Sequence, residues 1–284
     1  MLLILTLVLC VILFSACSPS TDEAPMDQKS RVTVDFSTFQ LDVEDMSRSS
    51  RAALSTAATR LSFAVFNAKG NLVNAIHQES KEANFGRVQM ELSSGTYTMV
   101  AVAHSGSADA IITSATSVEL PGTIFTDTFT KVQKLIVESN KDCSCSMTLD
   151  RITSAFILRV TDNPPTTVKE IEVVLNFGGI APTSLKINPT TGCAENNWKQ
   201  NSTIPVESIS TGVPIYFIGM NSSAMVMVKA IAKGENGAEI ISHLINEIPL
   251  ARNQKTIASG KFFTPKVSGT FTIENWGADK NLTY

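Results

Sequence analysis

The chain has 284 residues, of which 43% are hydrophobic and 17% charged, and its formal net charge is −3 at pH 7. These values are typical of a folded globular protein and exclude an intrinsically disordered chain. The sequence also lacks any basic block or stripe of alternating aromatic and basic residues, so we do not expect a nucleic-acid partner.

An apolar run covers residues 2–16 and is followed at once by polar residues. The run is short for a membrane span, which needs about 20 residues, and it fits the apolar region of a signal peptide. It ends in the tetrapeptide FSAC at residues 14–17, which resembles a bacterial lipobox. We therefore expect a signal peptide over residues 1–16 and lipidation of Cys17.

The alternative is an ordinary cleaved signal peptide that happens to precede a cysteine. No Lys or Arg precedes the apolar run, so the true start of the chain stays open. Because two or more acyl chains anchor a protein stably, an acylated Cys17 would hold the chain on a membrane, with residues 17–30 as a tether.

The rest of the first half alternates apolar and polar residues with period two, which is typical of half-buried β-strands. One segment, Tyr97–Ala103, is almost continuously apolar, so we expect it either to be buried on both faces or to lie in a sandwich core. Two Ala- and Ser-rich segments, residues 47–60 and 105–116, fit either a short helix or a loop. The strands expected here are Arg31–Phe36, Phe39–Val43, Leu61–Val65, Val88–Leu92, Tyr97–Ala103 and Leu135–Val137.

The second half continues the same pattern. The polar stretch Asn188–Ser210 predicts a long loop, with Trp198 attaching it to the body. Residues 234–237 (GENG) predict a hairpin connection. The strands expected here are Phe156–Val160, Ile171–Leu175, Ile215–Met220, Ala224–Ile231, Ile240–Ile248, Thr256–Ala258 and Gly269–Trp276.

Strands that recur at such short intervals are typical of β-sandwiches. About as many of them precede the polar segment 138–148 as follow it. The sequence therefore predicts an all-β protein with an N-terminal β-sandwich over residues 31–142 and a C-terminal one over residues 143–284. One large domain is the alternative.

No catalytic motif occurs, and no set of His and Cys residues has the spacing of a metal site. We therefore expect no enzyme activity, no cofactor and no metal ion. Besides Cys17, the mature chain contains Cys143, Cys145 and Cys193. These are either free thiols or include one disulfide to Cys193, because two cysteines two positions apart on a strand have poor geometry for a mutual bridge.

The last expected strand places Gly269, Phe271 and Ile273 on one face, and Trp276 ends it. A terminal strand of this kind can pair with the sheet of a partner, in which main-chain hydrogen bonds give affinity and alternating side chains give register. The alternative is an ordinary edge strand. A different hypothesis is a glycan-binding surface, for which Trp198 in the polar stretch is the candidate platform.

Five short motifs follow one another in a fixed order. They are LSFAVFNAKG (61–70), LSSGTY (92–97), FTDTF (125–129), LDRI (149–152) with Phe156, and IPL (248–250) followed by NQKT (253–256) and Gly260. Together with the lipobox, this order resembles the FimB-like anchor branch of the Bacteroidales fimbrillins, the type V pilus proteins.

The resemblance implies two consecutive transthyretin-like Greek-key β-sandwiches and a lipid anchor in the outer membrane, with the protein exposed on the cell surface. It also implies a non-enzymatic role: joining a fibre of other fimbrillin-like subunits to the membrane by β-strand complementation, in support of adhesion. The alternative is a surface glycan-binding lipoprotein. The position in the fibre and any proteolytic removal of an N-terminal strand stay open.

Overall fold

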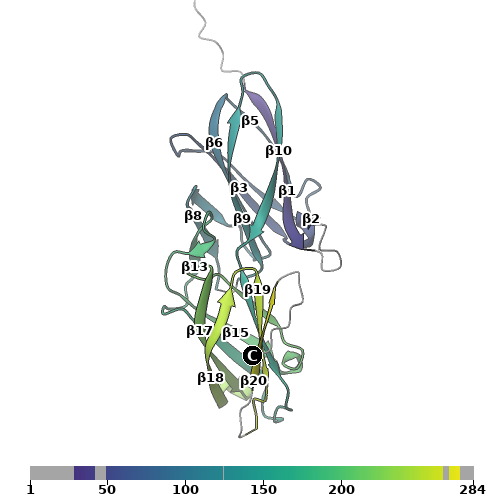
Figure 1. The fold of residues 1–284 in the computed structure, drawn as a ribbon, viewed down its shortest axis with the longest axis vertical. Helices are drawn as coiled ribbons and strands as arrows, with labels where there is room; N and C mark the ends of the chain where they lie inside the picture. The colour runs from purple at the N-terminus through teal and green to yellow at the C-terminus, as the bar shows by residue number, and fades with distance from the viewer. Residues whose placement is uncertain (1–28, 42–48, 124, 265–268, 276–284) are drawn as a thin grey trace, which may run out of the picture.

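The computed structural model describes residues 29–41, 49–123, 125–264 and 269–275, most of which lie in β-strands. The strands form two bodies stacked along the long axis of the molecule (Figure 1). The expected all-β class is therefore confirmed. No helix within the described ranges is long and apolar enough to cross a membrane. Cys17 and Trp276 lie outside these ranges.

The strands are numbered in the order in which they occur along the chain. The first ten are β1 (Ser30–Leu41), β2 (Ser49–Ala53), β3 (Arg60–Asn67), β4 (Leu72–Glu79), β5 (Arg87–Leu92), β6 (Gly95–His104), β7 (Ile111–Ser114), β8 (Ser117–Pro121), β9 (Thr128–Val137) and β10 (Cys143–Arg151). The others are β11 (Ser154–Val160), β12 (Glu170–Asn176), β13 (Ser184–Asn188), β14 (Cys193–Ala194), β15 (Lys199–Pro205), β16 (Pro214–Phe217), β17 (Ser223–Lys233), β18 (Glu239–Ala251), β19 (Gln254–Gly260) and β20 (Gly269–Asn275). Three short 3₁₀ helices are η1 (Leu54–Thr56), η2 (Val206–Ser208) and η3 (Glu235–Gly237).

The first body is a sandwich built around β1. This strand pairs in parallel with β10 on one edge and antiparallel with β5 and β2 on the other. The facing layer has the order β9-β6-β3-β4, and the end of β10 joins it by pairing with β9. Apolar side chains of both layers meet between them, among them Val32, Val34, Phe63, Met99 and Leu149.

The strands β3 and β6 are buried on both faces, which is one of the two placements expected for Tyr97–Ala103. Phe63 and Met99 point into the core of the first body, whereas Phe66 and Val100 contribute to a second core. Side chains alternate between the faces of a strand, so these two strands separate two apolar layers. The alternation of apolar and polar residues is lost here because no face meets water.

A small sheet of order β14-β13-β8-β7 joins the two bodies. It pairs Leu120 and Val118 of β8 with Leu185 and Ile187 of β13, and all four side chains are buried in the second core. The two bodies therefore share a sheet and a continuous apolar core rather than meeting through a linker.

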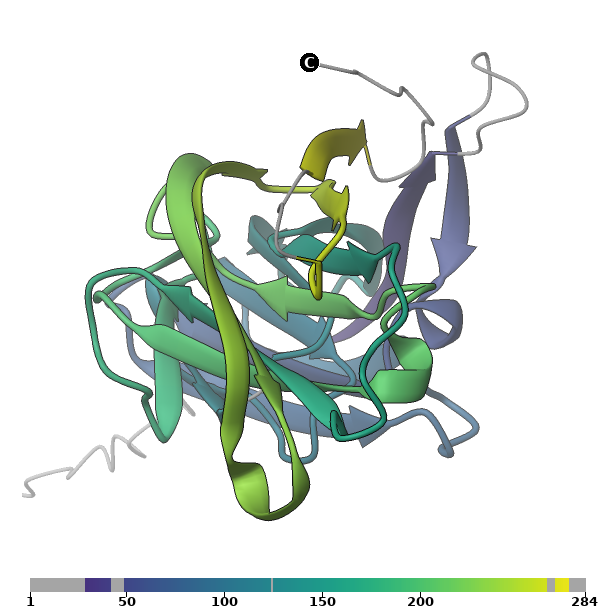
Figure 2. The same cartoon turned by 90° about the horizontal axis from the view of Figure 1, so that it is seen from below.

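The second body is a sandwich of two four-stranded sheets, ordered β16-β11-β19-β20 and β15-β12-β17-β18. Figure 2 shows these sheets from below, with β19 and β20 in yellow. Inward side chains from both sheets, such as Phe156, Ile171, Phe217 and Val228, fill the space between them. The expected hairpin at residues 234–237 connects β17 to β18 through η3.

The expected domain division differs from the observed pairing. The strand Cys143–Arg151, expected to open the second domain, pairs with β1, so the boundary after residue 142 falls inside the first sandwich. At the other end, Ser30 begins β1 and is buried, so the expected tether stops one residue earlier. Pairing over more than 100 residues cannot be read from local periodicity.

Three segments expected as helix or loop contain strands. Residues 47–60 include β2 and η1, and residues 105–116 include β7. The polar stretch Asn188–Ser210 contains β14 and β15. In β15 the inward residues Gln200 and Ser202 are polar, and they hydrogen-bond each other at 3.0 Å. Polar residues at these inward positions remove the apolar alternation by which a strand is recognised, and Oε1 of Gln200 is buried without a partner among the described residues.

Candidate partner-binding edge of the second body

The strand β20 forms one edge of the second sandwich. It pairs antiparallel with β19, where Gly269, Phe271 and Ile273 lie opposite Gly260, Ala258 and Thr256. Its other edge has no strand partner within the described part of the chain. The structure thus places the expected pairing strand at a sheet edge, where backbone N–H and C=O groups are available to another strand.

The chain that leads from β19 toward β20 is held by Asp162, which lies just after β11. The carboxylate of Asp162 accepts hydrogen bonds from the backbone N–H groups of Phe262, Phe263 and Thr264 at 2.7, 2.8 and 2.9 Å. Burial opposes ionisation of this carboxyl, but the three N–H donors outweigh it and lower the pKa of Asp162. Asp162 is therefore an attachment point for the β19–β20 connection.

Phe262 anchors the same connection from the other side. Its ring is 4% exposed and meets the imidazole of His243 edge to face, with the ring centres 4.6 Å apart. The Nε2–H of His243 donates to the carbonyl of Phe262 at 2.8 Å. His243 is part of β18, so the β19–β20 connection is attached to both sheets of the sandwich.

The opposite sheet also ends in an edge strand, β18, and carries exposed apolar side chains. Met225 and Met227 of β17 are 65% and 51% exposed, and Leu244 of β18 is 57% exposed. Leu244 lies opposite Lys229 in the antiparallel pair, on the face that also carries the two methionines. The second body thus offers the edge strand β20 in one sheet and the edge strand β18 in the other. Met225, Met227 and Leu244 form an exposed apolar stripe on the sheet that contains β18.

The structure contradicts a glycan platform at Trp198. The indole is 1% exposed, stacks on Phe177 at 5.1 Å and meets Phe125 edge to face at 5.2 Å. Its Nε1–H donates to the carbonyl of Ile218 at 3.0 Å. Trp198 therefore attaches its segment to the core, as expected, and leaves no ring face for a sugar.

Chemically reactive groups are sparse within the described ranges. Cys143, Cys145 and Cys193 are free thiols, and no cluster of three or more His, Cys, Asp or Glu side chains there could hold a metal ion. His104 is buried, and it accepts a hydrogen bond from the backbone N–H of Gly106 at 2.9 Å. Burial, with the nearby Arg60 charge, lowers the pKa of His104 to about 4, which fits a neutral structural histidine.

A cluster that the sequence analysis missed lies where the two bodies meet. Arg151 at the end of β10 forms an ion pair with Asp127 at 2.9 Å and donates to the side chain of Asn253 at 3.1 Å. Thr153 donates to the same Asp127 carboxylate at 2.7 Å. Asp127, Arg151 and Asn253 belong to three of the short motifs (FTDTF, LDRI and NQKT), so the motif order was the signal that pointed to them.

Comparison with known proteins agrees with this fold. A candidate adhesin from Bacteroides ovatus is 14% identical, has a TM-score of 0.54, and the match covers 90% of this chain and 95% of the other. A candidate polysaccharide-binding protein from Bacteroides thetaiotaomicron is 11% identical with a TM-score of 0.53 and coverage of 87% and 96%. A fimbrial assembly protein from Parabacteroides distasonis is 12% identical with a TM-score of 0.50 and coverage of 90% and 99%.

These identities support the shared fold alone. No curated protein sequence matches the chain. A family model, described as Fimbrillin-A associated anchor proteins Mfa1 and Mfa2, matches residues 21–175, which is more than half of the chain. The chain therefore belongs to the family of fimbrillin-A associated anchor proteins.

Proposed function

We propose that this protein is a non-enzymatic, lipid-anchored fimbrial anchor or subunit that joins a surface fibre to the outer membrane by β-strand complementation. Membership of the anchor family supports the fimbrial role. In this proposal, an acyl group on Cys17 holds the protein on the membrane, and Gly269, Phe271, Ile273 and Trp276 belong to the segment that pairs with a neighbouring subunit.

The observation that carries the proposal is the separation between the start of β1 and the edge strand β20. β1 runs parallel to β10, and β10 ends at the junction with the second body. The first residues of β1 therefore lie at the far end of the first body, and β20 belongs to the opposite body (Figure 1). A tether that precedes β1 would leave the second body pointing away from the membrane, toward a fibre.

The shared core supports the same role mechanically. A protein that links a fibre to a membrane must carry load between its two ends. The sheet β14-β13-β8-β7 and the continuous core beside it tie the two bodies together without a flexible linker. A load applied at β20 would then pass through packed strands to β1.

Two variants test the proposal in cells. Deletion of residues 269–284 should abolish fibre attachment while the protein stays in the membrane fraction. Cys17→Ala should release the protein from the membrane while purified protein still binds fibre subunits. Cys193→Ala is the matched control for the cysteine change and should behave as wild type in both assays. Intact, membrane-attached fibres in both test variants would contradict the proposal.

Glycan binding is not proposed as a second function. One structurally similar protein is described as a candidate polysaccharide-binding protein, but that similarity supports only the fold. The burial of Trp198 removes the aromatic platform on which the hypothesis depended.

A further inference from the structure

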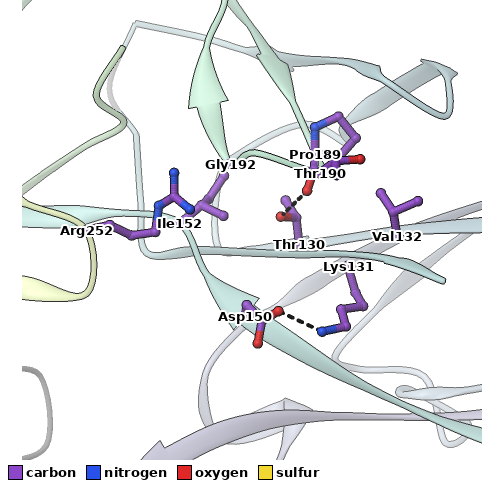
Figure 3. Close-up of a pocket in the computed structure, with 9 residues that line it drawn as sticks. All are labelled: Thr130, Lys131, Val132, Asp150, Ile152, Pro189, Thr190, Gly192 and Arg252. Carbon is purple, nitrogen blue, oxygen red and sulfur yellow. Dashed lines mark hydrogen bonds and ion pairs between the residues drawn. The ribbon is translucent and has the colours of Figure 1, made fainter. Parts of the chain in front are cut away.

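A pocket of about 140 Å³ lies at the junction of the two bodies. Its walls come from β9 and β10 of the first body, from the loop that follows β13, and from the turn between β18 and β19 (Figure 3). We name it the junction pocket. It is distinct from the β20 edge and contains no residue that the proposed function uses.

Arg252 forms one side of the junction pocket, and its positive charge has no carboxylate partner there. Arg252 is half-buried, and none of the ion pairs among the described residues includes it. One guanidinium nitrogen, Nη2, donates to the sulfur of Cys193 at 3.1 Å. The Nε–H is buried and has no hydrogen-bond partner. An unsatisfied buried donor is costly, and an acceptor bound beside this guanidinium would reduce that cost.

The other charges of the pocket cancel. Lys131 and Asp150 line the opposite side and form an ion pair at 2.8 Å (Figure 3). The junction pocket therefore has one net positive charge, that of Arg252. A ligand with a single negative charge balances it, whereas a dianion would add a charge next to Asp150.

Gly192 packs its backbone closely against Arg252 and Ile152. Its φ angle is +63°, a conformation that side chains other than that of Gly rarely adopt. A Cβ atom at this position would lie 3.1 Å from Cζ of Arg252 and 2.5 Å from Cγ2 of Ile152. Any side chain here would collide with Ile152 and crowd the guanidinium, so glycine lets this loop pack its backbone directly against the wall of the pocket.

We propose that the junction pocket binds a carboxylate, with Arg252 as the charged partner. A carboxylate has the single charge that the pocket lacks, and its two oxygens match the parallel N–H groups of a guanidinium. The volume admits a short stem bearing the carboxylate. The source is either a small free carboxylate or an acidic side chain of a protein partner.

The experiment titrates the full chain, in detergent, with small probes and follows the ¹⁵N–¹H signals of the Gly192 amide and the Arg252 Nε–H group by NMR. Acetate tests a free carboxylate, and acetamide is its uncharged counterpart. The peptide acetyl-Gly-Asp-Gly-amide tests a protein side chain, and the same peptide with Asn is its counterpart. We expect both carboxylate probes to shift these signals saturably and both amides to leave them unchanged.

Two variants complete the test. Arg252→Gln should weaken carboxylate binding at least tenfold, measured from the Gly192 amide. The control Arg159→Gln removes a guanidinium from β11, outside the pocket, and should bind as wild type. Thermal melting of both variants checks that they fold. Tighter binding of the Asp peptide than of acetate would identify a protein partner as the source, and the reverse order a free carboxylate.

Three results would each overturn the proposal. These are equal shifts with acetate and acetamide, no saturation with either carboxylate, or unchanged affinity in a folded Arg252→Gln variant. None of them bears on fibre attachment, so failure here would leave the proposed anchor function standing.

Discussion

Arg151 donates hydrogen bonds to both oxygens of the Asp127 carboxylate, from Nε at 2.9 Å and from Nη2 at 2.9 Å, across 24 positions of sequence. The Arg151 guanidinium also lies 4.9 Å from the ring centre of Phe129. A further bond to Asn253 reaches 102 positions along the chain. One side chain thereby fixes the end of β10 to the turn between β18 and β19 and joins the two bodies.

Arg151→Met should lower the free energy of unfolding by about 3 kcal/mol, because it leaves the Asp127 carboxylate without its counter-ion. The two side chains are only 12% and 17% exposed, so water cannot replace the lost partner. Chemical denaturation measures the change. The matched control is Lys141→Met, which breaks an ion pair whose side chains are 67% and 64% exposed and should have a much smaller effect, because solvent screens this pair. Equal effects of the two changes would contradict this account.

Asp162→Ala should loosen the connection to β20 while leaving the rest of the second sandwich folded. Three backbone N–H groups lose their acceptor at once. Hydrogen exchange should show faster exchange of these amides and of β20, with β12 and β17 unchanged. Uniformly faster exchange through both sheets would show that Asp162 stabilises the whole body instead.

The Asp162 interaction should also fail in acid. Its pKa is lowered in the folded state, so its contribution to stability is fully present above the ordinary value of 3.8 and is lost as the pH falls through the lower folded pKa. Asp162→Asn should therefore remove an acid-dependent part of the unfolding free energy that wild type shows below pH 3.8. An identical pH profile for the two proteins would exclude this linkage.

His104 should make stability depend on pH in a different range. The folded pKa of His104 is about 4, against the ordinary histidine value of 6.5, so between these two pH values the unfolded chain binds a proton that the folded chain does not. Stability should be complete above pH 6.5 and should fall by about 3 kcal/mol as the pH drops to 4. The variant His104→Asn keeps an acceptor for the Gly106 N–H and should flatten this part of the profile. A profile unchanged by the substitution would contradict the assignment.

Trp198→Ala should destabilise the protein by about 3 to 5 kcal/mol, since it leaves a large cavity and removes the hydrogen bond to Ile218. Trp198→Phe should cost less because most of the ring volume remains. Thermal or chemical unfolding measures both. Full stability of the alanine variant, combined with loss of retention on a glycan affinity gel, would restore the platform hypothesis.

Much of the fold is readable from the sequence because local patterns report burial. The period-two alternation identifies strands such as β5, where Val88, Met90 and Leu92 are buried and the residues between them are exposed. The continuous apolar run in β6 correctly predicts a buried strand. The pattern failed in β15, where the polar residues Gln200 and Ser202 lie inward and hydrogen-bond each other.

The candidate site was only partly readable. The alternation in residues 269–275 correctly gave a strand, and its edge position in the sheet came from the structure. Nothing in the local sequence pointed to Arg252, because an arginine in a turn is ordinarily solvated. That Arg252 has no carboxylate partner among the described residues becomes visible only when all neighbouring strands are in place.

The sequence by itself determined the β class, the signal-like start and the scarcity of catalytic groups, because composition and period-two patterning depend on nearby residues. Only the tertiary structure decided where the bodies divide, that Cys143–Arg151 pairs with β1, and that Asp127, Arg151 and Asn253 meet at the junction. Some of these relationships join residues more than 100 positions apart in the sequence. They arise because strands pair and cores close across the whole chain, which no local pattern encodes.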